Sequence, residues 1–164
     1  MKQLYIKQKV FSVRGKFTVK DQNEHDVYFI EGSLMQIPKT YSIMDTAMNQ
    51  VAFITKKSFS FLPTFYVDVV GQERMTIKKE FTFIKANYTI DAAGIEVRGN
   101  LWDMNFEVLQ NGELIGSVDK QWFTWGDSYQ IQVLQEDMET LLVSLVVAID
   151  YAKASQAAAG SATI

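Results

Sequence analysis

The segment LLVSLVVAIDY at residues 141–151 decides the fold of this chain. From 141 to 149 its apolar residues point in every direction around a helical wheel, and a helix that is apolar on all sides is buried on all sides. Ser144 is the sole polar residue in that range, and its hydroxyl can donate to a carbonyl one turn earlier. We expect the helix to begin after an Asp137 N-cap and to run to Lys153, whose charge suits the helix dipole.

This helix is too short in its apolar part to cross a bilayer, because its nine residues fall well below the ~20 that a span needs. The N-terminal sequence has no apolar core of signal-peptide length. The chain contains no cysteine, which excludes disulfides, Cys-ligated metal centres and thiolate nucleophiles. We therefore expect a cytoplasmic protein with no transmembrane segment, no metal and no cofactor.

Six aromatic residues, each followed two positions later by Val or Ile, mark the rest of the chain. Side chains two positions apart lie on the same face of a β-strand, so each pair predicts a strand with one buried face. The alternate positions are mostly polar and would face water. The six pairs are Phe17/Val19, Tyr41/Ile43, Phe65/Val67, Tyr88/Ile90, Phe106/Val108 and Tyr129/Ile131.

A second strand follows most of these pairs after a turn signal. The strongest signal is Asn111-Gly112, because a type I′ hairpin turn needs positive φ at both central residues. The repeated unit is therefore a β-hairpin, and five or six hairpins give ten to twelve antiparallel strands. The second strands are expected at Asp26–Gly32, Gln50–Lys57, Glu73–Glu80, Ile95–Gly99 and Glu113–Lys120.

Hairpins that enclose a helix on all sides form a closed barrel. A helix of about 17 residues measures roughly 25 Å and strands of six or seven residues reach about 20 Å, so the two lengths match. A β-trefoil has no channel for a helix, and propeller blades need about 40–45 residues each. We predict a mainly β fold: a closed antiparallel barrel of about twelve strands around a buried C-terminal α-helix. It forms one domain over residues 1–153, and residues 154–164 form a flexible Ala/Ser/Gly tail.

Four segments carry a family resemblance: YIKQKVFSVRGKFTV at 5–19, KKEFTFIKANYTI at 78–90, WFTWGDSY at 122–129 and LLVSLVVAIDY at 141–151. In these segments and in their order, the chain resembles bacterial members of the LURP-one-related family, within the tubby C-terminal-like superfamily. The resemblance implies a twelve-stranded barrel around a C-terminal helix. It also implies an association with lipid, since tubby-like domains are associated with phosphoinositide membranes and scramblase relatives with lipid movement. That implication is an analogy between folds.

The net charge of −3 is unevenly distributed along the sequence. Residues 1–90 hold 13 Lys/Arg against 8 Asp/Glu, a net +5, and residues 91–164 hold 3 against 11, a net −8. Such an asymmetry is typical of an interaction face, although a dipolar solvated surface explains it as well. An acidic chain without an Arg-rich groove lacks the electrostatic pattern of nucleic-acid binding, so no nucleic acid is expected as a partner.

Two lysine pairs end the second strands of successive hairpins, and they are our candidate binding residues for lipid or another anion: Lys56, Lys57, Lys78 and Lys79. If equivalent positions share one rim, these lysines could form a basic patch for anionic headgroups. Other members of such a patch would be Arg74, Lys85, Lys7 and Lys9. The alternative explanation is that the lysines protect strand ends and edges from aggregation.

Candidates for catalysis are weak. His25, the one histidine, lies in a polar stretch typical of an exposed turn. Asp103 and Glu107 lie near aromatic residues that could raise a carboxyl pKa, but no second acid is fixed opposite them. Trp122 and Trp125 would anchor a partner if exposed, and would plug one end of the barrel if buried, which we favour.

We therefore expect no enzyme but a non-catalytic intracellular binding domain that associates with anionic lipid or membrane surfaces through a basic patch. The alternative is a protein-interaction scaffold without lipid binding. A small-molecule enzyme that uses carboxylates is the third candidate, and it would require a cavity beside Asp103 and Glu107.

Overall fold

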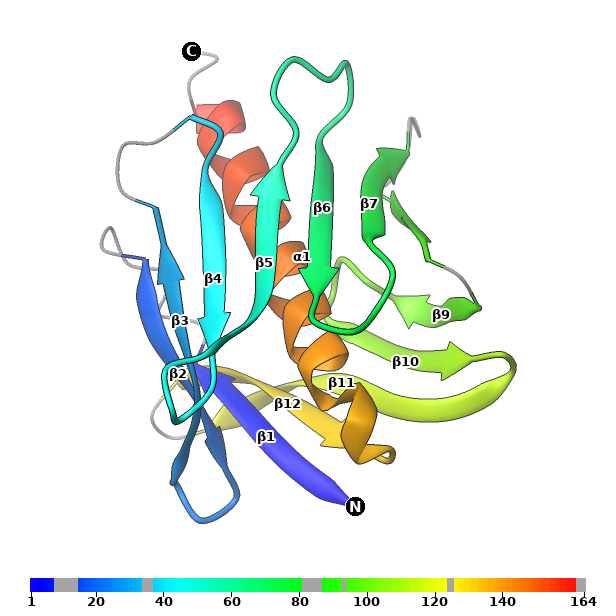
Figure 1. Ribbon diagram of the computed structural model, residues 1–164. Helices are drawn as coiled ribbons and strands as arrows, with labels where there is room; N and C mark the ends of the chain where they lie inside the picture. The colour runs from blue at the N-terminus through cyan, green and yellow to red at the C-terminus, as the bar shows by residue number, and fades with distance from the viewer. Residues whose placement is uncertain (8–14, 34–36, 81–86, 93, 124–125, 162–164) are drawn as a thin grey trace.

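The computed structural model describes residues 1–7, 15–33, 37–80, 87–92, 94–123 and 126–161 of the 164. Within these ranges, twelve antiparallel strands form a single sheet that curves around one long C-terminal helix (Figure 1). The strands are β1 Lys2–Lys7, β2 Lys16–Asp21, β3 Asp26–Gly32, β4 Thr40–Met44, β5 Gln50–Lys56, β6 Thr64–Val69, β7 Met75–Glu80, β8 Asn87–Asp91, β9 Ile95–Asn100, β10 Asn105–Gln110, β11 Glu113–Phe123 and β12 Gly126–Val133. A short 3-10 helix, η2 Glu136–Met138, leads into α1 Glu139–Ser161.

The sheet is a meander in which the first and last strands of the chain pair with each other. Its order is β8-β7-β6-β5-β4-β3-β2-β1-β12-β11-β10-β9, so β1 pairs with β12. The sixth predicted strand, β12, therefore takes its partner from the N-terminus of the chain instead of from a following hairpin strand. The turn at Asn111-Gly112 has positive φ at both residues, 49° and 85°, as the sequence predicts for the hairpin of β10 and β11.

One expected hairpin does not form. The sequence predicts that the strand with Tyr88 and Ile90 pairs with the strand at 95–99, but β8 forms its ladder with β7 and β9 forms its ladder with β10. Among the described residues no ladder joins β8 to β9, and Figure 1 shows β9 running across the direction of β7. The barrel is thus nearly closed, and the corner between β8 and β9 is its open seam.

The inward-facing side chains are those that the alternation predicts. Phe17, Tyr41, Phe65, Phe106 and Tyr129, together with the Val or Ile two positions after each, are no more than 5% exposed. Ile90 is partly buried, and the side chain of Tyr88 lies outside the described residues. These aromatic and β-branched residues form the wall that contacts the helix.

The helix α1 occupies the axis of the barrel. Every residue from Leu141 to Ala152 is at most 8% exposed, which confirms burial on all sides. The Ser144 hydroxyl donates to the Thr140 carbonyl oxygen at 2.7 Å, also as predicted. On β11, Gly116 lets the helix approach closely, since a Cβ there would lie 2.5 Å from a Leu142 methyl group and from the Gln132 carbonyl oxygen. The predicted fold class is confirmed, with a nearly closed barrel in place of a fully closed one.

Both ends of the helix differ from the expectation. Asp137 does not cap α1, because it lies inside η2, and the α-helix begins two residues later at Glu139. The helix continues to Ser161, so residues 154–161 are helical where the sequence predicts a flexible tail. Alanine is the best helix former, and the run of alanines there extends a helix that the barrel has already nucleated. Residues 162–164 lie outside the described part.

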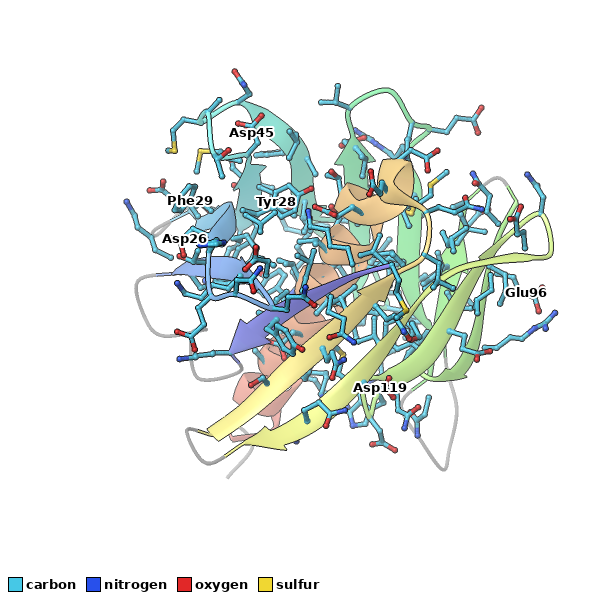
Figure 2. The ribbon with its side chains drawn as sticks, turned by 90° about the horizontal axis from the view of Figure 1, so that it is seen from below. Asp26, Tyr28, Phe29, Asp45, Glu96 and Asp119 are labelled. Carbon is cyan, nitrogen blue, oxygen red and sulfur yellow. The ribbon has the colours of Figure 1, made fainter. Side chains whose placement is uncertain are left out.

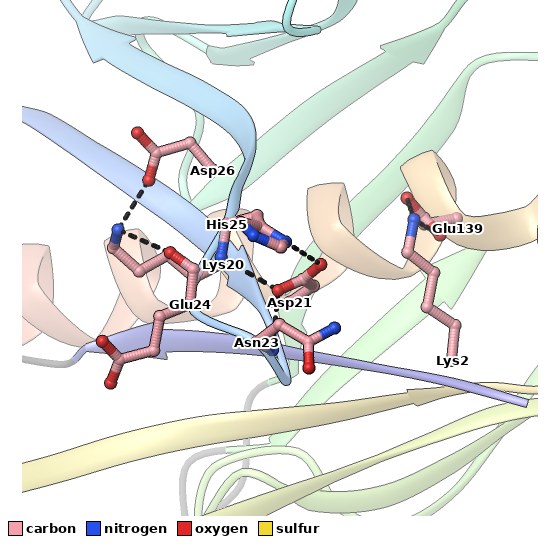
Figure 3. A network of polar contacts seen from close by, with 8 residues as sticks. All are labelled: Lys2, Lys20, Asp21, Asn23, Glu24, His25, Asp26 and Glu139. Atoms are coloured by element: carbon pink, nitrogen blue, oxygen red, sulfur yellow. Dashed lines mark hydrogen bonds and ion pairs between the residues drawn. The ribbon is translucent and has the colours of Figure 1, made fainter.

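The start of the helix is fixed to the sheet by a buried carboxylate. Glu139 accepts hydrogen bonds from the Lys2 ammonium group at 2.9 Å and from the Tyr28 hydroxyl at 2.8 Å. Glu139 is 6% exposed, and its negative charge in the first turn also suits the helix dipole. One carboxylate therefore ties β1 and β3 to α1; Figure 3 shows Lys2 reaching Glu139.

A test of this architecture replaces Val146 at the centre of α1 by Asp. An unpaired carboxylate in the barrel axis costs about 5 kcal/mol or more, which is comparable with the whole stability of a domain of this size. We expect Val146→Asp to abolish the cooperative thermal transition measured by circular dichroism. The matched control is Val70→Asp, since Val70 is 74% exposed, and it should melt like the native protein. A soluble, cooperatively folded Val146→Asp protein would place the helix outside the barrel.

Candidate functional site

Charged side chains are sorted between the two ends of the barrel. We call the end where α1 finishes the lysine end; in the described residues it carries Lys7, Lys16, Lys39, Lys56, Lys57, Lys78, Lys79 and Lys153. We call the other the acidic end; its strand ends and turns carry Asp21, Glu24, Asp26, Asp45, Glu73, Asp91, Glu113, Glu136, Asp137 and Glu139. Figure 2 views the molecule from the acidic end, with Asp26 and Asp45 labelled. The separation is not complete, since Glu31 lies at the lysine end beside Lys16, and Lys2, Lys20 and Arg74 lie at the acidic end. Among the described residues, lysines nevertheless predominate at one end of the barrel and acids at the other.

The four predicted lysines all lie at the lysine end, around the start of β6. The backbone N–H of Lys57 donates to the Thr64 carbonyl oxygen at 2.8 Å, and Thr64 is the register partner of Lys78. Lys57 and Lys78 therefore flank β6 at one level, with Cα atoms about 10 Å apart. Both are exposed, whereas Lys56 and Lys79, on the alternate face of their strands, are half-buried.

The described cations include some that pair with carboxylates and some that do not; the four predicted lysines belong to the second group, together with Lys39 and Lys153, whose ammonium groups lie over aromatic rings. Lys2, Lys16, Lys20, Arg74 and Arg98 each form an ion pair with an acid at 2.6–2.9 Å. Within the described ranges no ion pair involves the four predicted lysines. Of the additional patch members that the sequence suggests, Lys7 lies at the lysine end, Arg74 lies at the acidic end, and Lys9 and Lys85 lie outside the described residues.

Exposed phenylalanines in the loop between β5 and β6 are a feature that the sequence analysis missed. Phe59 and Phe61 are almost fully exposed, and the loop joins Lys56 to the strand beside Lys78. Ile37, in the adjacent β3–β4 loop, is 91% exposed, and the two loops meet where the Lys56 N–H donates to the Lys39 carbonyl oxygen. Exposed apolar side chains and lysines without a described carboxylate partner thus share one end of the molecule, where the β5–β6 loop lies at the upper side of Figure 1. The signal in the sequence was Phe59-Ser60-Phe61, an aromatic alternation that lacks the β-branched partner of the core pairs.

The predicted candidates for catalysis are dispersed. His25 is exposed in the turn between β2 and β3, as predicted, with its Nδ1 atom 3.3 Å from Asp21 (Figure 3). The Asp103 carboxylate accepts a hydrogen bond from the Asn100 side chain, and the Asp103 N–H donates to Asn100 Oδ1 at 3.0 Å, which makes Asp103 part of a turn. Glu107 is exposed on β10. The side chains of Trp122 and Trp125 lie outside the described residues.

Across the described ranges, no cluster of three or more His, Asp or Glu side chains could hold a metal ion. No helix in those ranges is both long enough and apolar enough to cross a bilayer.

A buried carboxyl group, also missed by the sequence analysis, lies within the helix near the lysine end. Asp150 is 5% exposed and accepts a hydrogen bond of 2.5 Å from the Tyr129 hydroxyl on β12. Burial raises the pKa of Asp150 from its ordinary value of 3.8 to about 6, although the Tyr129 hydrogen bond and the charges of Lys153 and Lys120 oppose this rise. Nothing in the sequence distinguishes Asp150 from a solvated helix acid, because its burial follows from the barrel.

The fold and its polarised ends define a class of protein: a nearly closed antiparallel barrel that encloses its own C-terminal helix. The model of the LURP-one-related family matches residues 2–150, and the chain belongs to that family. It is similar to an uncharacterized Bacillus subtilis protein, YxjI, with 27% identity over 150 residues that cover 92% of this chain and 93% of the relative. The bacterial relative agrees with the bacterial type of member that the sequence suggests.

The same fold occurs in a solved structure. An X-ray structure of an Arabidopsis thaliana protein superimposes with a TM-score of 0.58 at 13% identity, over 92% of this chain and 90% of the plant protein. At that level of identity the likeness establishes the fold.

The buried carboxyl group of Asp150 leads to a pH-dependent prediction. Its pKa is raised in the folded state, so the folded protein binds more protons than the unfolded chain between about pH 4 and 6, and stability falls as pH rises through that window. A rise from 3.8 to about 6 corresponds to about 3 kcal/mol lost above pH 6. Asp150→Asn keeps an acceptor for Tyr129, so at pH 7 it should be more stable than the native protein by about 2–3 kcal/mol in urea unfolding.

The comparison should be made across pH, because other carboxylates titrate in the same range. The gain of Asp150→Asn over the native protein should shrink as the pH is lowered toward 4. The control is Asp119→Asn, which changes a carboxylate of β11 (Figure 2) on the face opposite to the buried Val118. If the free energy of unfolding of Asp150→Asn varied with pH in the same way as that of the native protein, this result would contradict a raised pKa of Asp150.

Proposed function

We propose that this protein is a non-catalytic domain that binds anionic lipid surfaces through its lysine end. The observation that carries the proposal is the combination, around one loop, of two exposed phenylalanines and four lysines that have no carboxylate partner among the described residues. Lysines that protect strand edges have no need of neighbouring exposed aromatic residues. Residues that bind a membrane interface need both, because cations attract headgroups and apolar rings enter the boundary with the acyl chains.

The magnitudes are sufficient for reversible binding. Each lysine near an anionic leaflet contributes about 1 kcal/mol, and burial of a Phe side chain contributes roughly 1.5–3 kcal/mol. Phe59 has a φ of 58°, a left-handed conformation that costs a bulky residue roughly 1–2 kcal/mol. This strained backbone holds an apolar ring in water in the free protein, and transfer of the ring into a bilayer would offset the cost.

The net negative charge of the protein does not oppose this proposal. The acids lie mainly at the far end of the barrel, about 20 Å away along strands of six residues. The Debye length at physiological ionic strength is about 8 Å, so a surface at the lysine end interacts with the lysines and hardly with the acidic end. We therefore propose an orientation in which the lysine end faces the membrane and the start of α1 points away from it.

The main alternative is a protein-interaction scaffold, because a protein surface could also cover Phe59 and Phe61. Four unpaired lysines in a row around the loop favour an extended anionic surface, which can engage all of them at once. Vesicle binding separates the two functions, since a scaffold would not distinguish anionic from zwitterionic vesicles.

The first experiment measures the contribution of charge by sedimentation with vesicles. The native protein should co-sediment with phosphatidylserine/phosphatidylcholine vesicles at low salt and remain in solution with phosphatidylcholine alone. The double variant Lys57→Gln/Lys78→Gln loses about 2 kcal/mol, so its partition coefficient should fall about 30-fold and its salt dependence should become weaker. The control Arg74→Gln/Arg98→Gln makes the same change in net charge away from the loop, at cations already paired with acids, and should bind normally. Equal losses of vesicle binding in the two double variants would show that net charge alone causes the effect, and would contradict a binding site at the lysine end.

The second experiment measures the contribution of the aromatic loop. Phe59→Ser/Phe61→Ser should lower the partition coefficient by at least about tenfold while leaving the salt dependence unchanged, because no charge is removed. The control Met48→Ser/Val70→Ser removes two exposed apolar side chains from the acidic end and should have no effect. Native retention of the phenylalanine variant on vesicles would show that the rings do not enter the bilayer, and partner capture should then be tested instead.

A further inference from the structure

The strands β1 and β2 are neighbours in the sheet but are joined at only two positions. The described ladder between them consists of Leu4 with Asp21 and Tyr5 with Lys20, whereas β1 pairs with β12 at six successive positions from Lys2 to Lys7. Toward the lysine end, Ile6 and Lys7 have no ladder partner in β2. Among the described residues the two strands therefore separate, which leaves an opening between them in the outer wall of the barrel.

A cavity of about 490 Å³ lies at this opening, within the size range of sites for small ligands. Its lining includes Tyr5 and Lys7 from β1, Phe17 and Thr18 from β2, and Ser128 from β12. The cavity follows β2 from Lys16 to Asp21, a length of about 17 Å. The Tyr5 ring and the aliphatic parts of lysine side chains make part of this wall apolar, whereas the Phe17 side chain faces inward to the core.

Ser128 gives the cavity an unsatisfied polar group. The residue is 1% exposed, and its Oγ atom is buried with no hydrogen-bond partner among the described residues. Buried hydroxyl groups are almost always hydrogen-bonded, because an unpaired one keeps its full cost of desolvation. A hydroxyl that is buried, unpartnered and part of a cavity wall is therefore suited to a polar group on a ligand.

The charges around the cavity define where that polar group lies. Lys7 is the register partner of Ser128, and Lys16, which also pairs with Glu31 at 2.9 Å, lines the same half of the cavity, toward the lysine end. Asp21 and Glu24 line the opposite half, near the turn between β2 and β3, together with Lys20, whose charge is paired with Asp26 at 2.6 Å (Figure 3). An anionic headgroup is thus favoured beside Ser128 and disfavoured at the other half, and the Tyr5 ring lies along the lining for an apolar chain.

We propose that this cavity is a binding site for a single-chain amphipathic molecule with one anionic headgroup. The headgroup accepts a hydrogen bond from Ser128 and is attracted by Lys7 and Lys16, and the alkyl chain lies in the opening between β1 and β2. The site is separate from the loop of Phe59 and Phe61, and this inference does not rest on the proposed membrane binding.

Laurate below its micellar concentration is the probe, measured by titration calorimetry. We expect saturable binding of one laurate per chain, and dodecanol, which has the same chain without the charge, should bind about tenfold more weakly. Inorganic phosphate should not compete, because it lacks the chain. Absence of saturable laurate binding would overturn the proposal, and equal affinities for laurate and dodecanol would overturn the role of the anionic headgroup.

The variant Ser128→Ala distinguishes a ligand-binding role of Ser128 from a purely structural one, because the two roles predict different effects on stability and on laurate affinity. Removal of an unpartnered buried hydroxyl should raise the melting temperature of the ligand-free protein while it lowers the affinity for laurate about fivefold or more. The control is Ser117→Ala on β11, whose hydroxyl donates to Gln132 at 3.3 Å, and its laurate affinity should be native. An unchanged laurate affinity in Ser128→Ala would remove Ser128 from the site.

A third variant, Thr18→Trp, fills the cavity from β2 and should abolish laurate binding. Native laurate affinity in folded Thr18→Trp would place the binding site elsewhere. Ser128→Ala and Thr18→Trp should both still co-sediment with anionic vesicles. Laurate binding therefore tests the cavity, and vesicle co-sedimentation tests the membrane surface independently of it.

Discussion

A helix without a polar face must be enclosed from every direction, and the rest of this structure depends on that constraint. Twelve residues in succession, from Leu141 to Ala152, are buried around their whole circumference. A sheet that packs on one side of a helix cannot achieve this, so the hairpins must continue around it until the chain meets itself. The pairing of β1 with β12 and the attachment of Glu139 to Lys2 are the points where this closure is made.

The enclosed helix also determines where function can lie. The barrel axis is filled with side chains, which leaves the two ends and the outer wall to contact other molecules. At the ends, the sorted charges complement the helix, since acids gather near the partial positive charge of its start and lysines near the partial negative charge of its end. Among the described residues, neighbouring strands lose their ladder in the outer wall between β8 and β9 and between β1 and β2.

Much of the fold could be predicted from the sequence because two local patterns of apolar residues determine it. Alternation of aromatic and β-branched residues marks the strands, and the loss of any polar stripe marks the buried helix. The missing ladder between the described residues of β8 and β9 could not be predicted. A turn motif predicts that the chain reverses direction, but it does not predict whether the strands on its two sides pair. The helical residues 154–161 were missed for a related reason, since a run of alanines becomes helical when a folded helix precedes it.

The candidate sites were less accessible to prediction than the fold. The lysines at 56, 57, 78 and 79 could be recognised as equivalent positions in successive hairpins, but only the positions of the described carboxylates show that none of these pairs with them. From the sequence alone, Phe59 and Phe61 resemble ordinary core residues, and only the position of their loop outside the barrel shows that they are exposed. Ser128 is one serine among several, and only the separation of β1 from β2 makes its hydroxyl conspicuous.

The pairing of the first strand with the last has a consequence for biosynthesis. The helix that fills the barrel follows all twelve strands in the chain, so it leaves the ribosome after them, and the hairpins cannot bury their inner faces against it until it has emerged. At about 5–20 residues per second, the early hairpins wait roughly ten to thirty seconds with aromatic side chains in water. Contacts between residues more than 120 positions apart then form late and slowly, as with Lys2 and Glu139. During this interval the nascent chain is a natural client for chaperones, and premature termination before residue 141 leaves a sheet with nothing to enclose.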